Sequence, residues 1–329
     1  MPGRLTPDAL VVDAEEVVER IVAELREVVH GRLRRRGAVL GLSGGIDSSV
    51  CLALCARAFG PERTLGVLMP EADSAADTLE LSNLAAERFG VETVLEDITG
   101  TLDAVGCYRR RDEAFRSVIP EYGPGWKAKI VLPSLLGGSA YRLFSVVAES
   151  PTGERVEARL PSAAYRQVVA ATSFKQRTRK MLEYFHADRL DYAVVGTPNR
   201  LEYDQGFFVK NGDGAADVKP IAHLYKTQVY QLAEALDVPA TIRERPPTTD
   251  TYALEQSQEE FYFSVPYETM DLCLYARNNG YAAADVAEAV GLSPEDVERV
   301  LGDIDQKRRT TAYLQLGPQL LEPVPEIDH

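Results

Sequence analysis

A run of glycines and serines around one carboxylate is the feature of this sequence that most resembles a binding loop. Residues 43–49 read SGGIDSS, and they follow GAVLGL at 37–42, a short apolar run that is typical of a buried parallel strand. Gly44 and Gly45 permit a tight turn and let backbone N–H groups approach an anion without a Cβ atom in the way. The hydroxyls of the three serines add further donors. The loop therefore predicts a phosphate-binding site between a strand and a helix.

Asp47 is the one acidic residue of this loop. A carboxylate beside a phosphate is repulsive unless a cation bridges the two groups, so Asp47 implies a magnesium ion shared with the substrate's phosphates. No lysine follows the loop. This excludes the GxxxxGK[ST] loop, in which a lysine contacts the phosphates.

The SGGIDSS segment resembles the pyrophosphate-binding loop of the N-type ATP pyrophosphatases. That resemblance implies ATP as co-substrate, Mg²⁺ as cofactor, and an adenylate formed with release of pyrophosphate. It does not choose among the members of that superfamily, which amidate, ligate or modify RNA. The ATP-binding residues that it implies here are Gly41, Leu42, Ser43, Gly44, Gly45, Ile46, Asp47 and Ser48.

A second block, at residues 192–228, narrows the choice. It reads YAVVGTPNRLEYDQGFFVKNGDGAADVKPIAHLYKTQ and follows KQRTR at 175–179. Order and spacing resemble the NAD synthetase family. The resemblance implies metal ligands Asp47 and Glu202, catalytic residues Asp47 and Lys226, further ATP contacts at Thr197, Lys226 and Thr248, and substrate contacts at Arg179, Lys210, Asp217 and Lys307.

The implied reaction needs no general base. An ionised substrate carboxylate attacks the α-phosphorus of ATP, ammonia attacks the acyl-adenylate, and AMP leaves. Magnesium and Lys226 would stabilise the charge that develops on pyrophosphate. The four histidines are scattered and suggest no triad or metal cluster. We expect no amidase domain in this chain, so ammonia would come free from solution or from a separate glutaminase.

Three hypotheses about the substrate stay open. The Lys210–Asp217 block favours amidation of deamido-NAD to NAD. The second hypothesis is an amide ligase for a different carboxylate, such as a nucleotide or a specialised metabolite. It would suit the insertion at 120–168 and the departures from the family pattern, which include Ala215, Leu68 and Gln306. An RNA-modifying ATP pyrophosphatase is the third hypothesis. The net charge of −14 counts against it, because nucleic-acid binding needs cations that neutralise phosphates.

The elements that must position these residues alternate along the chain. Apolar patterns predict strands at 37–42, 65–69, 92–98 and 192–195, with helices at 13–35, 49–59, 77–89, 175–185 and 227–236. This alternation predicts a doubly wound parallel α/β sheet, which the resemblance makes adenine nucleotide alpha hydrolase-like. We expect one domain over 1–329, with a hairpin (141–149 and 154–160) inside the insertion and a helical C-terminal extension at 281–329.

Composition and the remaining motifs bear on location and partners. Cys51, Cys55, Cys107 and Cys273 form no CxxC pair, and Cys51 and Cys55 are spaced as core residues of a buried helix. There is no signal peptide and no apolar run long enough for a membrane span, so we expect a cytoplasmic protein without membrane or nucleic-acid partners. Residues 285–301 resemble a helix-turn-helix, but their acidic second helix predicts a packing element. The family resemblance implies a homodimer.

Overall fold

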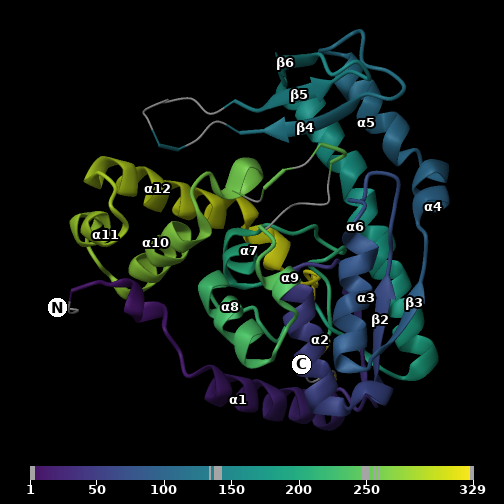
Figure 1. Ribbon diagram of the computed structural model, residues 1–329, viewed down its shortest axis with the longest axis vertical. Coiled ribbons are helices and arrows are strands. Elements are labelled where there is room, and N and C mark those ends of the chain that lie inside the picture. Colours follow the sequence, from purple (N-terminus) through teal and green to yellow (C-terminus); the bar gives the residue numbers. More distant parts are fainter. Residues whose placement is uncertain are drawn as a thin grey trace.

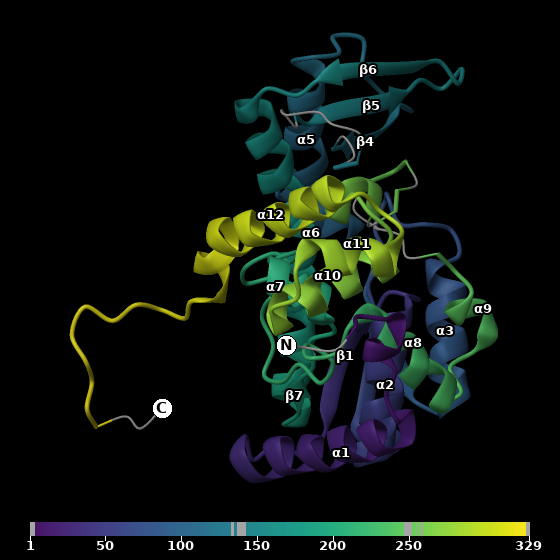
Figure 2. The ribbon, with the colours of Figure 1, turned by 90° about the vertical axis from the view of Figure 1, so that its left-hand side faces the viewer.

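The computed structural model describes residues 4–132, 135–136, 143–246, 252–254, 256–257 and 259–326. Four parallel strands form its central sheet in the order β3-β2-β1-β7. Figure 1 labels β2 and β3, and Figure 2 labels β1 and β7. They are β1 (Ala38–Leu42), β2 (Thr64–Leu68), β3 (Glu92–Leu95) and β7 (Ala193–Val194). All four predicted strands are present, and the predicted parallel α/β fold is confirmed.

Helices cover both faces of this sheet, and the alternation of side chains along β1 shows why. Ala38, Leu40 and Leu42 belong to a core shared with α1 (Ala14–Arg26), α2 (Ile46–Phe59), α3 (Thr78–Phe89) and α8 (Lys226–Ala235). Val39 points to the opposite face, where it packs with residues of α4 (Thr99–Ala104) and α6 (Ser162–Leu190). A strand buried on both faces needs apolar residues at every position, which is what the GAVLGL run provides.

The first two predicted helices differ from their predicted bounds. The predicted helix at 13–35 is α1 followed by a π-helical segment, Glu27–Arg32. The helix predicted from residue 49 begins at Ile46. Asp47 and Ser48 therefore lie in the first turn of α2, where the backbone N–H groups have no partner within the helix. The N–H of Ser49 makes the first helical hydrogen bond, to the carbonyl oxygen of Gly45 at 3.1 Å.

The insertion forms a second, antiparallel sheet in the order β4-β5-β6. Its strands are β4 (Lys127–Val131), β5 (Ser145–Glu149) and β6 (Arg155–Arg159), and α5 (Cys107–Arg116) packs beside them. The predicted hairpin is confirmed, whereas β4 was not predicted. Residue 168, the predicted end of the insertion, lies inside α6, because that helix begins at Ser162 rather than near 175. In Figure 1, α6 runs from the antiparallel sheet down to the parallel sheet.

The C-terminal region is a separate helical layer. It contains α10 (Tyr267–Asn279), α11 (Ala283–Val290) and α12 (Pro294–Thr311), which share a core and lie against α7 (Arg200–Gln205). The helix-turn-helix-like segment packs here through Val286, Val297 and Val300, which are fully buried. The helical part ends at a 3₁₀ turn, Ala312–Gln315, so the predicted helical extension stops short of residue 316. Leu316–Glu326 lacks helix, since its glycine and three prolines disfavour one, and it leaves the body of the molecule (Figure 2).

Short elements complete the description. They are the 3₁₀ turns Pro7–Leu10 and Pro61–Arg63, helix α9 (Ala240–Arg243) and a π-helical turn, Glu259–Phe263. All four cysteines are buried and free, and the predicted core positions of Cys51 and Cys55 are confirmed. Across the described parts of the chain, no helix is both long and apolar enough to span a membrane.

Candidate active site

A cavity of about 420 Å³ lies at the carboxyl ends of β1 and β7. This is the edge at which open parallel sheets bind their ligands. The 41–48 loop, α6, α7 and the first residue of α8 contribute side chains to its wall. Predicted site residues that line it are Gly41, Leu42, Ser43, Gly45, Ile46, Asp47, Ser48, Arg179, Thr197, Glu202 and Lys226.

The loop's shape depends on glycine at one position. Gly44 has a φ of +69°, and a Cβ atom there would lie 2.9 Å from Leu81 Cβ and 3.0 Å from the carbonyl oxygen of Thr78. Gly45 is the N-cap of α2 and offers no side-chain acceptor to the first turn. The first-turn N–H groups beside the cavity are therefore suited to an anion.

The serine hydroxyls support the turn as well as the cavity. Ser48 and Ser49 each donate from Oγ to the carbonyl oxygen of Gly45 at 2.9 Å. The Oγ atoms of Ser43 and Ser48 lie 3.3 Å apart. Ser49 is 1% exposed, so its hydroxyl acts in the turn, whereas Ser43 and Ser48 line the cavity.

Asp47 is held from two directions. The ammonium group of Lys226 forms an ion pair with Oδ2 of Asp47, and Nδ2 of Asn199 donates to Oδ1 at 3.1 Å. Burial alone would lower the pKa of Lys226, but Asp47 and Glu202 raise it above its ordinary value, so this lysine stays charged. Asp271 on α10 fixes the start of α8 by accepting from the N–H groups of Lys226, at 3.2 Å, and Thr227, at 2.7 Å.

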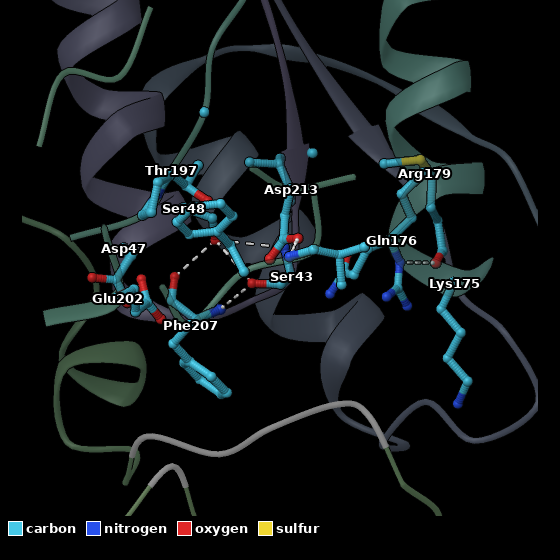
Figure 3. Close-up of a pocket in the computed structure, with 18 of the residues that line it drawn as sticks. Ser43, Asp47, Ser48, Lys175, Gln176, Arg179, Thr197, Glu202, Phe207 and Asp213 are labelled. Carbon is cyan, nitrogen blue, oxygen red and sulfur yellow. Dashed lines mark hydrogen bonds between the residues drawn. The ribbon is translucent and has the colours of Figure 1, made fainter. Parts of the chain in front are cut away.

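Glu202 approaches Asp47 from α7. Asn199 caps this short helix, and a carboxylate oxygen of Glu202 accepts in return from the N–H of Asn199 at 3.0 Å. Burial raises the pKa of Glu202 well above its ordinary value, and the charge of Asp47 raises it further. Two carboxylates that each disfavour the other's charge fit a divalent cation, because the cation would stabilise both ionised forms. Figure 3 shows Asp47 and Glu202 at one side of the cavity.

Arg179 lies on the other side of the cavity, on α6 (Figure 3). Its Nε donates to the carbonyl oxygen of Met69, directly after β2, at 3.4 Å. Glu183, one turn further along α6, covers Gly41, where a Cβ atom would lie 2.9 Å from its Oε1. The cavity thus has a carboxylate pair at one side and a guanidinium at the other.

Three predicted substrate residues lie outside the lining of this cavity. Lys210 donates to the carbonyl oxygens of Tyr313 and Leu316 at 2.8 and 2.9 Å. Asp217 accepts from the N–H of Val194 at 2.7 Å. Lys307 pairs with Asp303 at 2.7 Å. Thr248 lies outside the described residues.

The structure also bears on one departure from the family pattern. Ala215 replaces a glycine of the motif, yet it is not among the residues with positive φ. A Cβ atom therefore adds no backbone strain at this position. By contrast, a Cβ atom at Gly214 would clash with the ring of Phe208 and lie 2.9 Å from the carbonyl oxygen of Val209.

Sequence reasoning missed Asn199 and Asp271. Asn199 had a local signal, since Asn followed three residues later by Glu202 is the pattern of a capping box. Asp271 had no local signal, because it lies 44 positions along the chain from its partner Thr227.

Comparison with known proteins agrees with this geometry. The sequence matches the NAD synthase family over residues 17–117 and 150–311. The chain belongs to the NAD synthase family. It is 59% identical over 321 residues to the NH₃-dependent NAD⁺ synthetase of Rhizobium meliloti (strain 1021), covering 98% of this chain and 96% of the relative. The corresponding protein of Thermotoga maritima is 33% identical, covering 86% and 92% of the two chains.

Solved structures support the fold. The NH₃-dependent NAD synthetase of Campylobacter jejuni matches 95% of this chain and 100% of its own, with a TM-score of 0.62 and 21% identity. An NMN synthetase from Francisella tularensis matches 95% and 99% of the two chains, with a TM-score of 0.65 and 21% identity.

The family match also marks the insertion. The family match covers residues up to 117 and again from 150, so all of β4 and β5 falls in the unmatched gap. The R. meliloti relative nevertheless aligns over 98% of the chain. The segment that forms β4 and β5 therefore lies outside the residues matched by the general family pattern, whereas β6 lies within them.

Proposed function

We propose that this protein is an ammonia-dependent NAD synthetase, which amidates deamido-NAD to NAD and splits ATP into AMP and pyrophosphate. The observation that carries the proposal is the convergence of Asp47, Glu202 and Lys226 at the N-terminus of α2. Identity to curated NH₃-dependent synthetases over nearly the whole chain supports it.

Each part of the cavity has a role in this reaction. First-turn amides of α2 and the hydroxyls of Ser43 and Ser48 would bind the departing phosphates. Asp47 and Glu202 would hold Mg²⁺, which supplies charge neutralisation on those phosphates. Lys226 adds a cation that is already in place before reaction, so little reorganisation is needed.

Arg179 would orient the substrate's anionic groups, at the side of the cavity away from the carboxylate pair. The substrate carboxylate is itself the nucleophile toward the α-phosphorus, so this chain has to align it rather than deprotonate it. Ammonia then attacks the acyl-adenylate, and AMP leaves.

The competing function is amidation of a smaller or unrelated carboxylate. It is favoured by the insertion, because α6 extends from it and brings Tyr165 and Val169 to the cavity wall. Lys210 and Lys307, which the resemblance assigns to the dinucleotide, lie outside the cavity lining, and this also favours the competing function.

Steady-state assays would decide between the two. The protein is incubated with ATP, Mg²⁺, ammonium and either deamido-NAD, nicotinate mononucleotide or an unrelated carboxylate, and the amide product and AMP are measured. The proposal requires deamido-NAD to be preferred by about a hundredfold or more in kcat/KM, since binding of its adenylate half helps to orient the acyl group. Amidation of another carboxylate, with deamido-NAD inert, would overturn it.

We infer that the functional unit is a cytoplasmic homodimer. In a twofold interface, the same surface of each subunit meets its copy. The family that the sequence resembles completes its dinucleotide site at such an interface. Lys210, Asp217 and Lys307 stay candidates for that second half of the site. Sedimentation should give a dimer at micromolar concentration, and a fully active monomer would contradict it.

A further inference from the structure

A cluster of buried charges lies next to the cavity, on the Arg179 side. It joins the loop after β2 to α5 and α6, and its members are Glu71, Asp73, Tyr108, Arg111 and Lys175. The side chains of Lys175 and Glu71 are 2% and 0% exposed. In Figure 3 the Lys175 side chain extends away from Asp47 and Glu202.

The contacts within the cluster are close and specific. Nζ of Lys175 donates to Oε1 of Glu71 at 2.9 Å and to Oδ2 of Asp73 at 2.7 Å. Arg111 forms a second ion pair with Asp73, and the hydroxyl of Tyr108 donates to the other oxygen of Glu71 at 2.8 Å. Although burial alone would raise the pKa of Asp73, Lys175 and Arg111 hold it below its ordinary value. The carboxylate therefore stays ionised.

Burying these charges costs solvation free energy that their mutual attraction only partly offsets. The main effect of these ion pairs is on the position of the loop rather than on stability. Lys175 and Arg111 together have eight N–H donors, and when these face two carboxylates with water excluded, few arrangements of the loop are possible. The cluster therefore determines where residues 71–73 lie relative to α6.

The same loop carries the acceptor that orients Arg179. Arg179 follows Lys175 by four residues, so the two side chains lie on one face of α6. Arg179 donates to the carbonyl oxygen of Met69, and Lys175 binds Glu71, two residues further along. Met69, Pro70, Lys175 and Arg179 all line the cavity. One helix thus contacts a short loop at two successive points.

We propose that Lys175 is a positioning residue for substrate binding, which acts by holding the Met69–Asp73 loop so that Arg179 faces the cavity. This rests on the proposed function, since it assigns Arg179 to the dinucleotide. It also gives the insertion a connection to the site, because Arg111 belongs to α5, immediately before the antiparallel sheet. Asp47, Glu202 and Lys226 belong to other elements and keep their own contacts.

The test is a set of variants of the full-length protein. Lys175→Met keeps the length of the side chain and removes its charge. Lys175→Arg keeps a charge that can reach both carboxylates. The double variant Lys175→Met, Asp73→Asn keeps one buried cation, Arg111, and one buried carboxylate, Glu71. Because its buried charges stay balanced, it replaces Lys175→Met if that single variant does not fold. Arg109→Met, which removes an exposed cation of α5 paired with Glu113, is the matched control.

Wild-type protein is assayed first, and failure to amidate deamido-NAD would refute the proposed function rather than this role. For Lys175→Met, or for the double variant if the single one fails to fold, we expect KM for deamido-NAD to rise about tenfold with kcat within about threefold. The Mg²⁺ concentration for half-maximal rate should stay unchanged. Lys175→Arg should recover most of the loss, and Arg109→Met should match wild type.

Equilibrium binding of deamido-NAD, measured by calorimetry without ATP, should weaken by the same factor. An unchanged KM and unchanged binding in the folded variant would overturn the proposal. A fall in kcat alone, or a loss that the arginine variant does not relieve, would also overturn it, since neither is expected if the lysine charge positions a binding residue.

Discussion

The side-chain amide of Asn199 donates from Nδ2 to Oδ1 of Asp47 at 3.1 Å. Its oxygen accepts from the N–H of Glu202 at 3.3 Å, and Asn199 is 1% exposed. A single buried side chain thus joins the carboxylate of Asp47 on α2 to the backbone of Glu202 on α7. It therefore helps to fix the distance between the two carboxylates.

Replacing Asn199 by serine should keep its cap of α7 and remove its hydrogen bond to Asp47. Serine also caps helices well, so α7 should form and the free energy of unfolding should change by less than about 1 kcal/mol. Its shorter side chain cannot reach Asp47, and the Mg²⁺ concentration for half-maximal pyrophosphate release should rise about tenfold. Asn199→Ala should lose the cap as well. Metal titration and thermal melting check both statements, and an unchanged metal dependence in Asn199→Ser would contradict the first.

Asp47→Asn and Glu202→Gln should each reduce pyrophosphate release by roughly a hundredfold or more, because each removes one charge from the proposed magnesium clamp. Circular dichroism and melting should stay close to wild type. Glu113→Gln, an exposed carboxylate of α5, is the control and should be fully active. Wild-type turnover of either site variant at saturating magnesium would refute its metal role.

Gly44→Ala should destabilise the protein by about 2–4 kcal/mol, since it adds left-handed strain and a contact too close to Leu81 and Thr78. Gly302 lies within α12 with nothing within 4 Å of an added Cβ. Gly302→Ala should therefore stabilise by up to about 1 kcal/mol. Denaturant unfolding measures both, and the two changes should differ in sign.

Stability should fall with acidification below the ordinary carboxyl range, partly through Asp73. Its pKa is lower in the folded state, so its ion pairs stabilise the protein at neutral pH and are lost as pH falls through the folded-state pKa. Asp73→Asn should be less stable at pH 7 and show a shallower pH dependence below about 4. Melting temperatures across pH 2–7 would check this, and parallel curves for the two proteins would contradict it.

Local pattern was enough to place the parallel strands and the loop, because the buried strands β1, β2 and β7 are almost entirely apolar and the loop follows β1 directly. The sequence also indicated Asp47, Glu202 and Lys226, whose convergence the structure confirms. Contacts such as Lys226 with Asp271 escaped prediction, since they join residues far apart in the chain. The antiparallel β4 was missed for a related reason, as a strand with lysines at two of five positions becomes recognisable only beside β5.

The length of α6 has a consequence for cooperativity of folding. This helix of 29 residues supplies Val168 to the core of the antiparallel sheet and Ala187 to the core of the parallel sheet. Neither core can melt fully without exposing apolar surface on a helix that the other core also needs. The two sheets should therefore unfold in a single calorimetric transition, and the antiparallel sheet is poorly suited to excision as an independent unit.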